Sequence, residues 1–450
     1  MHSNLQFIIQ PGGALRGSVR VPGDKSISHR SIMLGALAEG VTEVSGFLQG
    51  EDSLNTLRCF RRMGVQIEGP ETLGTGRVRI HGVGLHGLQK PDSPLWLGNS
   101  GTSMRLMSGI IAGQDFDAVM EGDESLSRRP MRRVIEPLAL MGARIDAEEG
   151  GKPPLRVHGG SALQGIRYLM PMASAQVKSC VLLAGLYASG ETCVTEPAPT
   201  RDHTERMLQG FGYEVRRQTG ENGVSTVCLH GGGKLSATAI DVPADISSAA
   251  FFLVAASIAA DSDLLLEHVG VNPTRTGVID ILRLMGANIE LLNERLVGGE
   301  PVADLRVRSS ALHGIAIPEH LVPLAIDEFP VLFIAAACAQ GETVLTGAEE
   351  LRVKESDRIQ VMADGLQALG VDAQPTADGM VIRGGVMSGG EMSTHGDHRI
   401  AMSFAVAALR ATGEIRIHDC ENVNTSFPGF VELAQNVGLR IRAEQVAPRG

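Results

Sequence analysis

The chain has 450 residues, with 40 Lys and Arg against 51 Asp and Glu, which gives a formal net charge of −11. The length predicts more than one domain, and an apolar content of 43% excludes wholesale disorder. The acidic balance argues against a nucleic-acid-binding protein, because such binding depends on neutralising phosphates. It leaves room for a small anionic ligand, since a pocket responds to its local charge.

The sequence shows no sign of export or of a membrane segment. Its first residues lack a basic stretch followed by a long apolar run, so we expect no signal peptide. Apolar runs such as residues 249–260 are shorter than the ~18–20 residues that span a bilayer. The six cysteines form no CxxC pair and predict reduced, buried thiols in a cytoplasmic protein. The histidines show no metal-ligand spacing, so we expect neither a metal site nor a cofactor.

Six repeated units follow one another along the chain. Each contains a nearly all-apolar helix, typical of a buried helix, then a strand, and then an amphipathic helix closed by a glycine and followed by another strand. The predicted buried helices cover residues 28–39, 102–112, 175–188, 247–260, 329–339 and 399–411. The closing glycines are Gly64, Gly142, Gly212, Gly286, Gly370 and Gly438. These units predict an α/β fold of two lobes with three units each, rather than a solenoid.

Polar and charged residues gather where the buried helices begin. The segments are residues 24–30 (DKSISHR), 98–105 (GNSGTSMR), 173–178 (ASAQVK), 244–248 (ADISS), 326–330 (IDEFP) and 396–399 (GDHR). Helix N-termini bind anions, and Arg grips phosphate or carboxylate groups, so this pattern indicates a polyanionic ligand. Further basic clusters occupy residues 128–130, 201–203 and 354–358. Taken singly, each segment also fits an ordinary helix cap or a solvated helix face.

Two glycine-rich segments imitate nucleotide-binding motifs. Residues 82–87 (GVGLHG) match GxGxxG, but Pro91 and Pro94 stand where the helix of a dinucleotide fold would begin. Residues 231–234 (GGGK) lack the first glycine of a phosphate loop, because Cys228 occupies that position. Neither segment predicts a nucleotide site.

Several of the longer motifs resemble the EPSP synthase family of the shikimate pathway. They are residues 23–30 (GDKSISHR), 97–102 (LGNSGT), 201–204 (RDHT), 354–358 (KESDR) and 397–402 (DHRIAM), and residues 171–179 and 272–277 resemble the bacterial class II branch. The resemblance covers essentially the whole chain. It implies an inside-out α/β barrel in each lobe, with residues 1–22 and 244–450 in lobe I, residues 23–243 in lobe II and the active site in the cleft between them.

The resemblance also implies a reaction. The family transfers the enolpyruvyl group of phosphoenolpyruvate to the 5-hydroxyl of shikimate 3-phosphate and releases phosphate. By motif position Asp327 is the expected base, Glu355 exchanges the methylene proton, and Lys25 polarises the reacting oxygen. The expected phosphoenolpyruvate contacts are Lys25, Gly101, Arg129, Gln176, Arg358 and Arg399. The expected shikimate 3-phosphate contacts are Lys25, Ser26, Arg30, Ser174, Ala175, Gln176, Arg201, Asp327 and Lys354.

One position departs from the family pattern, and one related activity stays open. Many members carry a Lys shortly before the Phe-Pro pair, where this chain has Thr425 and Ser426, so one phosphoenolpyruvate contact is missing or supplied elsewhere. The alternative is UDP-N-acetylglucosamine enolpyruvyl transferase, which would favour a reactive Cys in residues 122–133, where this chain has none. We expect a monomer that binds neither nucleic acid nor membrane, and Gly101 leaves space for the inhibitor glyphosate.

Overall fold

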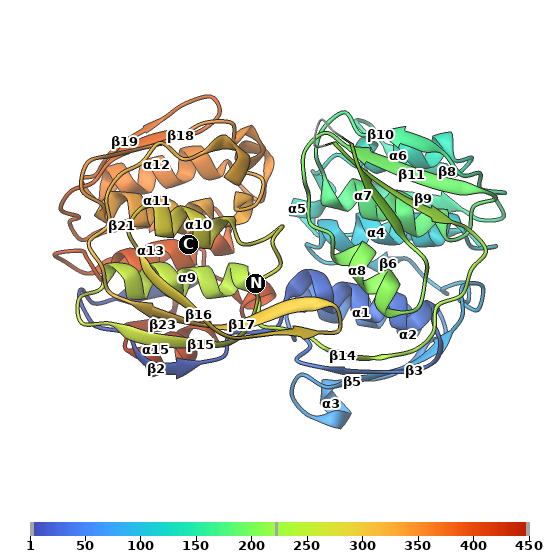
Figure 1. Cartoon of the computed structure of the whole chain (residues 1–450), viewed down its shortest axis with the longest axis horizontal. Helices are drawn as coiled ribbons and strands as arrows, with labels where there is room; N and C mark the ends of the chain where they lie inside the picture. Colours follow the sequence, from blue (N-terminus) through green and yellow to red (C-terminus); the bar gives the residue numbers. More distant parts are fainter. Residues whose placement is uncertain (1–3, 221–223, 447–450) are drawn as a thin grey trace. The chain divides into compact units, whose positions relative to one another are not determined.

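The computed structural model describes residues 4–220 and 224–446 of the chain. Its contacts divide into two compact units, drawn in Figure 1. Unit 1 comprises Met1–Pro22, Pro243–Leu296 and Pro301–Gly450, and unit 2 comprises Gly23–Val242 and Val297–Glu300. The chain thus leaves unit 1 after one short segment and returns to it near residue 243, while the turn at residues 297–300 belongs with unit 2.

Unit 2 is built from three similar repeats. Three buried helices contact one another in its interior: α1 (Lys25–Leu37), α4 (Gly101–Ala112) and α7 (Ala175–Gly185). Three four-stranded sheets surround them, and the amphipathic helices α2 (Glu51–Arg62), α6 (Arg132–Leu140) and α8 (His203–Gly210) link the strands. Two further short helices, α3 (Pro70–Leu73) and α5 (Glu124–Ser127), lie in the connections.

The strand order is the same in the three sheets of unit 2. Each has a parallel edge strand, then the strand after the buried helix, then the two strands of an antiparallel hairpin. The orders are β14 (Ala239–Asp241), β3 (Glu39–Ser45), β5 (Val78–Val83), β4 (Gln66–Glu68); β6 (Leu95–Trp96), β7 (Ala118–Glu121), β9 (Lys152–His158), β8 (Arg144–Glu148); and β10 (Arg167–Leu169), β11 (Glu191–Glu196), β13 (Ser225–His230), β12 (Arg216–Thr219).

Unit 1 repeats this plan around α9 (Ile246–Ile258), α11 (Phe329–Cys338) and α13 (His398–Ala407), which contact one another. The outer helices are α10 (Gly277–Leu284), α12 (Arg358–Ala368), α14 (Val423–Ser426) and α15 (Phe430–Val437), with 3-10 turns η1 (Glu319–Leu321), η2 (Ile326–Glu328) and η3 (Glu349–Val353). The sheets are β16 (Asn288–Val297), β17 (Glu300–Arg308), β15 (Asp263–Gly270), β2 (Arg16–Val19); β18 (Glu342–Leu345), β20 (Met380–Arg383), β19 (Asp372–Pro375); and β21 (Gly390–Ser393), β22 (Ile415–His418), β1 (Asn4–Ile9), β23 (Ile441–Val446).

The local rules used on the sequence explain these elements. All thirteen residues of α9 are buried, as its apolar composition predicts. The six glycines that close the amphipathic helices have φ angles between 78° and 119°, which glycine adopts without a steric penalty. These observations confirm the predicted α/β fold and its repeated units.

The parallel edge strands were not predicted from the sequence. They are β2, β6, β10, β14 and β21, and they contain only two to four residues each. Such short segments carry too few residues to show an alternating pattern.

The prediction that all cysteines are free thiols is wrong for one pair. Cys193 on β11 and Cys228 on β13 form a disulfide. The two residues are 35 positions apart in sequence, but the antiparallel register places them directly opposite each other. Cys59, Cys180 and Cys420 are buried free thiols, and Cys338 is half-buried. The spacing of the cysteines in the sequence contains no information about this register.

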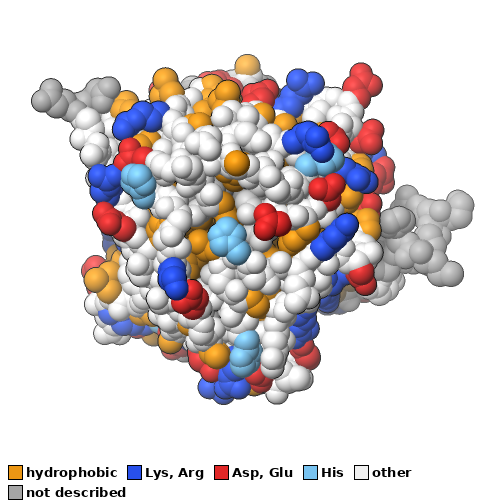
Figure 2. Space-filling view, turned by 90° about the vertical axis from the view of Figure 1, so that its right-hand side faces the viewer, with side chains coloured by type: hydrophobic (Ala, Val, Ile, Leu, Met, Phe, Trp, Pro, Cys, Tyr) orange, Lys and Arg blue, Asp and Glu red, His pale blue; other side chains and the backbone are white. Residues whose placement is uncertain are grey.

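The surface is mixed in charge, and the helices are short. Figure 2 shows one face of unit 2, where acidic and basic side chains are interspersed. Over residues 4–220 and 224–446, no helix combines the length and the apolar composition that crossing a bilayer requires.

Candidate functional site

Each buried helix of unit 2 begins with a residue whose side chain caps it, by accepting a hydrogen bond from a backbone N–H of the first turn. Asp24 accepts a hydrogen bond from Ile27 N over 2.8 Å at the start of α1. Ser100 accepts from Ser103 N over 3.1 Å at α4, and Ser174 accepts from Val177 N over 3.4 Å at α7. The positive ends of three helix dipoles are therefore defined by the residues that the sequence singled out.

Two cations project from the first turns of α1. Lys25 forms an ion pair with Asp52 of α2 and keeps a quarter of its side chain exposed. Arg30 is buried and donates from Nε to Thr204 Oγ1 over 2.7 Å and from Nη2 to Ser179 Oγ over 2.9 Å. Burial lowers the pKa of Arg30 to about 10, although the charges of Glu205 and Asp24 oppose that shift. Arg30 therefore remains a cation at neutral pH.

A second group of polar side chains joins the N-terminal turns of α4 and α7. Arg105 donates from Nη1 to Gln176 Oε1 over 2.6 Å, and Gln176 donates from Nε2 to Thr102 Oγ1 over 2.9 Å. A Cβ on Gly101 would lie 2.8 Å from Nη1 of Arg105 and 3.3 Å from Nη1 of Arg129. Gly101 thus leaves space for two guanidinium groups at one helix terminus.

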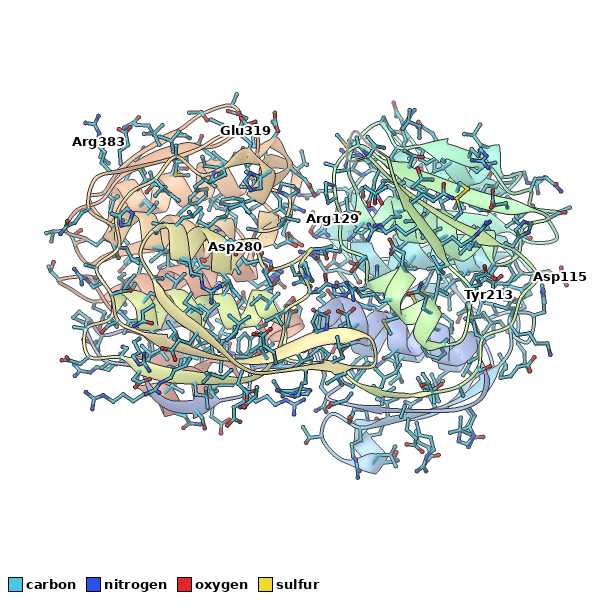
Figure 3. The ribbon with its side chains drawn as sticks, viewed as in Figure 1. Asp115, Arg129, Tyr213, Asp280, Glu319 and Arg383 are labelled. Carbon is cyan, nitrogen blue, oxygen red and sulfur yellow. A yellow bond between two sulfur atoms is a disulfide. The ribbon has the colours of Figure 1, made fainter. Side chains whose placement is uncertain are left out.

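Arg129, labelled in Figure 3, lies in the segment after α5. Its Nη2 donates to Asn99 Oδ1 over 2.5 Å and to Ser125 Oγ over 3.2 Å. Arg201 is half-buried immediately before α8, and its charge acts on Arg30. These basic groups come from different repeats of unit 2 and form a cationic cluster in that unit.

Unit 1 places three carboxylates against a buried guanidinium. Arg358, at the start of α12, has a side chain only 1% exposed. Its Nη1 lies 3.3 Å from Asp327 Oδ1, its Nη2 lies 2.6 Å from Glu355 Oε2, and its Nε lies 2.9 Å from Asp397 Oδ2. Burial lowers the pKa of Arg358, but the charges of Asp397, Glu355 and Asp327 outweigh it and hold that pKa above its ordinary value. Arg358 is therefore a permanent cation.

Asp327 is surrounded by further cations. It lies in η2 just before α11, and its Oδ1 is 3.5 Å from Lys354 Nζ, which also pairs with Glu350 at 2.6 Å. Arg399, in the first turn of α13, donates from Nη1 to the backbone carbonyl of Asp327 over 3.2 Å. The side chains of Asp327 and Glu355 are 15% and 29% exposed, so both carboxylates stay partly open to solvent.

The predicted site residues thus form two groups, one in each unit. Unit 2 carries Lys25, Ser26, Arg30, Gly101, Arg129, Ser174, Ala175, Gln176 and Arg201. Unit 1 carries Asp327, Lys354, Glu355, Arg358 and Arg399. The group in unit 2 is suited to binding phosphate and carboxylate groups, and the group in unit 1 adds two carboxylates that are able to move protons.

Three residues next to these groups were not among the predicted site residues. Asp397 caps α13 and holds Arg358, Arg105 holds Gln176, and Asp52 holds Lys25. Asp397 was the easiest to find, because an acidic residue stands at the start of a buried helix there. Arg105 was visible as a basic residue at the start of a buried helix, but its bond to Gln176 was not predicted. Asp52 gave no comparable signal, since its partner lies on another helix.

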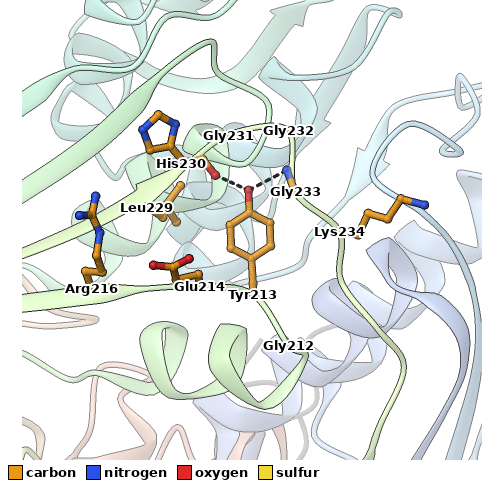
Figure 4. Close-up of a pocket in the computed structure, with 10 residues that line it drawn as sticks. All are labelled: Gly212, Tyr213, Glu214, Arg216, Leu229, His230, Gly231, Gly232, Gly233 and Lys234. Carbon is orange, nitrogen blue, oxygen red and sulfur yellow. Dashed lines mark hydrogen bonds between the residues drawn. The ribbon is translucent and has the colours of Figure 1, made fainter.

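A hollow of about 620 Å³ lies apart from both groups, beside the segment GGGK (Figure 4). There the Tyr213 hydroxyl donates to the carbonyl of His230 and accepts from the N–H of Gly233 over 3.2 Å. The N–H groups of Gly231 and Gly232 donate to the carbonyls of Gly190 and Leu186. These amides are committed to the protein, so this loop does not cradle a phosphate.

One set of possible metal ligands comes together within the described parts of the chain. Glu191, Cys193 and Cys228 place one donor atom each within 4.8 Å of one another. The two sulfur atoms are joined in the disulfide, whereas metal binding by cysteine requires thiolates.

The chain is similar to known proteins over nearly its whole length. The profile of the family EPSP synthase (3-phosphoshikimate 1-carboxyvinyltransferase) matches residues 9–433. The 3-phosphoshikimate 1-carboxyvinyltransferase of Methylococcus capsulatus is 70% identical over 442 residues, which cover 98% of this chain and 99% of the relative. That of Nitrosococcus oceani is 68% identical over 438 residues, or 97% of each chain. The EPSP synthase structure from Acinetobacter baumannii has a TM-score of 0.88 and 60% identity, covering 98% of this chain and 100% of that one.

A repeated α/β fold with cationic helix N-termini and carboxylates beside a buried arginine is the arrangement expected of an enzyme that handles anionic substrates. Together with the comparisons, it shows that the chain belongs to the EPSP synthase family. Its activity is that of a 3-phosphoshikimate 1-carboxyvinyltransferase.

Proposed function

We propose that the protein transfers the enolpyruvyl group of phosphoenolpyruvate to the 5-hydroxyl of shikimate 3-phosphate and releases inorganic phosphate. The arrangement around Arg358 carries this proposal: it orders Asp327 and Glu355, each beside a cation and each partly exposed. A protein that only bound anions would have no use for two carboxylates among its cationic groups. Both substrates are polyanions, which accounts for a cationic site in an acidic protein.

The proposed chemistry assigns one reacting position to each carboxylate. Glu355 gives a proton to the methylene carbon, which makes C2 of phosphoenolpyruvate electrophilic, and the 5-hydroxyl then adds to C2 as Asp327 takes its proton. The tetrahedral intermediate loses phosphate, and Glu355 takes back a proton from the methyl group. Lys25 polarises the reacting oxygen, and Asp52 holds its ammonium in place.

The proposed contacts of each substrate include residues from both groups. Phosphoenolpyruvate would contact Lys25, Gly101, Arg129, Gln176, Arg358 and Arg399, and shikimate 3-phosphate would contact Lys25, Ser26, Arg30, Ser174, Ala175, Gln176, Arg201, Asp327 and Lys354. Arg358 is the most enclosed of these, so its proposed share in binding depends on Asp327 and Glu355 turning toward the substrates. The hydroxyl of Thr425, near the position of the family's Lys, donates to the carbonyl of Asn422 over 2.6 Å.

One assay tests the reaction and its alternative. Purified protein is given phosphoenolpyruvate with either shikimate 3-phosphate or UDP-N-acetylglucosamine, and released phosphate is measured. With phosphoenolpyruvate present, we expect phosphate release when shikimate 3-phosphate is added and none when the UDP-sugar is added. The opposite result would identify the protein as the other enolpyruvyl transferase. Asp327→Asn is expected to bind both substrates and to lose turnover, and Glu355→Gln to slow solvent hydrogen exchange at the methylene group. Near-normal turnover of Asp327→Asn would remove Asp327 as the base.

Three finer expectations belong to this proposal. Residues 171–179 and 272–277 support membership of the class II branch. We also expect a cytoplasmic protein that is a monomer, and sedimentation of the purified protein would test the monomeric state. Glyphosate is expected to compete with phosphoenolpyruvate, because Gly101 leaves the end of α4 without a side chain.

A further inference from the structure

Lys178 is a buried cation that the proposed mechanism does not use. It lies on α7, two residues after Gln176, and its side chain is 0% exposed. Its Nζ is 3.0 Å from Glu196 Oε2 and 2.8 Å from Glu205 Oε1. A buried ammonium is unfavourable unless it is paired, and complete burial excludes contact with a substrate. Lys178 is therefore able to affect a substrate only through its two carboxylates.

The two carboxylates depend on Lys178 to different degrees. Glu196 also accepts hydrogen bonds from Thr200 Oγ1 over 2.6 Å and from Arg217 Nη2 over 2.9 Å. Glu205 has neither of its oxygens hydrogen-bonded, and Lys178 forms its one ion pair within residues 4–220 and 224–446. Loss of the ammonium would leave Glu196 with Arg217, but it would leave Glu205 without a counter-ion.

Arg30 of α1 binds the sequence neighbours of these residues on α7 and α8. Its Nη2 donates to Ser179, the neighbour of Lys178 on α7, and its Nε donates to Thr204, the neighbour of Glu205 on α8. Ser179 Oγ and Thr204 Oγ1 are 2.7 Å apart. The two helices are thus joined by two consecutive links, Lys178 with Glu205 and Ser179 with Thr204. The second link is also the one that holds Arg30.

Glu205 acts on Arg30 electrostatically as well. Among the charges around Arg30, Glu205 has the largest effect, and it raises the pKa of the guanidinium against the stronger influence of burial. In the intact protein Lys178 offsets the charge of Glu205. Without that offset, the carboxylate would attract the guanidinium away from an anionic ligand.

We propose that Lys178 is a positioning residue for shikimate 3-phosphate: by pairing with Glu205, it holds α7 and α8 in register and keeps Arg30 available to the substrate. This inference rests on the proposed function, which gives Arg30 to that substrate. Lys178 contacts neither substrate, and its effect is predicted to fall on the binding of one of them.

The first test replaces Lys178 with methionine, which has a similar length and no charge. In Lys178→Met we expect the KM for shikimate 3-phosphate to rise about tenfold or more, because a carboxylate loses its partner beside Arg30. The KM for phosphoenolpyruvate and kcat should stay within about threefold. Lys234→Met serves as the matched control, since Lys234 forms an exposed ion pair with Glu39. It should change none of the three constants.

The second test separates positioning from general damage to the fold. In Lys178→Met/Glu205→Gln both charges of the link are absent, and Glu196 keeps Arg217 as its partner. We expect the double variant to recover most of the wild-type KM for shikimate 3-phosphate. If the single variant does not fold, the double variant decides alone: a KM within about threefold of wild type supports the proposal, and a KM raised about tenfold overturns it.

The remaining outcomes are also decisive. If the wild type is active and folded Lys178→Met has an unchanged KM for shikimate 3-phosphate, this inference is overturned and the proposed function stands. Equal losses in both KM values and in kcat would show a structural role alone and would overturn it too. Absence of wild-type turnover would overturn the proposed function, and this inference with it.

Discussion

Arg105 on α4 donates a hydrogen bond from Nη1 to Oε1 of Gln176 on α7 over 2.6 Å. The same nitrogen would lie 2.8 Å from a Cβ atom added at Gly101. This distance is too short for a Cβ contact, so the guanidinium group would have to move. An alanine at this position would therefore displace Arg105, and also Arg129 at 3.3 Å, before it filled any space meant for a ligand.

Gly101→Ala is the variant that tests this relationship. We expect the KM for phosphoenolpyruvate to rise about tenfold, because a hydrogen bond of a charged group is lost or lengthened. The inhibition constant for glyphosate, which is longer than phosphoenolpyruvate, should rise by a larger factor. Steady-state kinetics measures both. Gly385→Ala is the control, since a methyl group there meets nothing within 4 Å. Equal glyphosate inhibition of wild type and Gly101→Ala would show that residue 101 does not govern inhibitor access.

Arg129 and Arg358 are both proposed to bind phosphoenolpyruvate, but their replacement should have different effects on the protein. Arg129 is half-buried and bonds only uncharged partners, Asn99 and Ser125, in the described structure. Arg129→Ala should weaken phosphoenolpyruvate binding about ten- to a hundredfold, through loss of a charge-assisted contact of about 1.5–3 kcal/mol. Its stability should change little. Arg128→Ala is the matched control, because Arg128 is an exposed neighbour that pairs with Glu124.

Arg358→Met should instead destabilise unit 1. It would leave Asp327, Glu355 and Asp397 without their shared counter-ion, and breaking such a buried pair costs about 3–5 kcal/mol. Urea unfolding and calorimetric titration with phosphoenolpyruvate separate the two variants. A lower stability of Arg129→Ala than of Arg358→Met would contradict these different roles.

The features predicted correctly from the sequence are those set by neighbouring residues. A glycine after an amphipathic helix predicts a left-handed backbone conformation at that residue. A helix that is apolar on all faces, such as α9, predicts that the helix is buried. Neither prediction needs knowledge of the surrounding elements. The charged helix starts were visible for the same reason, since capping is local. These signals predicted the repeated units. They also predicted that the site residues lie at helix starts or in connecting segments.

The features that escaped prediction depend on contacts between distant segments. The bond from Arg105 to Gln176 requires α4 and α7 to approach each other, and 71 residues separate the two positions. The disulfide requires the register of β11 against β13. A single sequence without related sequences carries no record of such pairings, whereas the packing of the repeats determines them.

Reduction of the disulfide should lower the stability of unit 2. Cys193 and Cys228 close a loop with a sequence separation of 35 residues. The chain-entropy relation gives about 3–4 kcal/mol for a loop of that length. We expect dithiothreitol to lower the unfolding midpoint of wild type but not that of Cys193→Ala/Cys228→Ala, which should already match the reduced protein. Cys59→Ala, which removes a free buried thiol, should keep its response to dithiothreitol. A wild-type midpoint that ignores the reductant would contradict the presence of the bond in solution.

The stability of the protein should also fall below neutral pH because of His29. Its ring is fully buried on α1, with Nδ1 2.9 Å from Thr56 Oγ1, and its Nε2 has no hydrogen-bond partner among the described residues. Burial, followed by the charges of Lys25 and Arg30, lowers the pKa of His29 well below its ordinary value of 6.5. The folded protein therefore disfavours the imidazolium.

The sign follows from comparing the folded and unfolded states. Above pH 6.5 His29 is neutral in both, so it adds no pH dependence. As the pH falls below 6.5, the unfolded chain takes up a proton that folded His29 refuses, and stability declines by up to about 1.4 kcal/mol per pH unit until the folded pKa is passed. Urea unfolding at pH 7.5 and at about pH 5.5 should show a smaller loss in His29→Gln than in wild type. His320→Gln, at an exposed position, should behave as wild type. The same loss in His29→Gln and wild type would exclude His29 as the source.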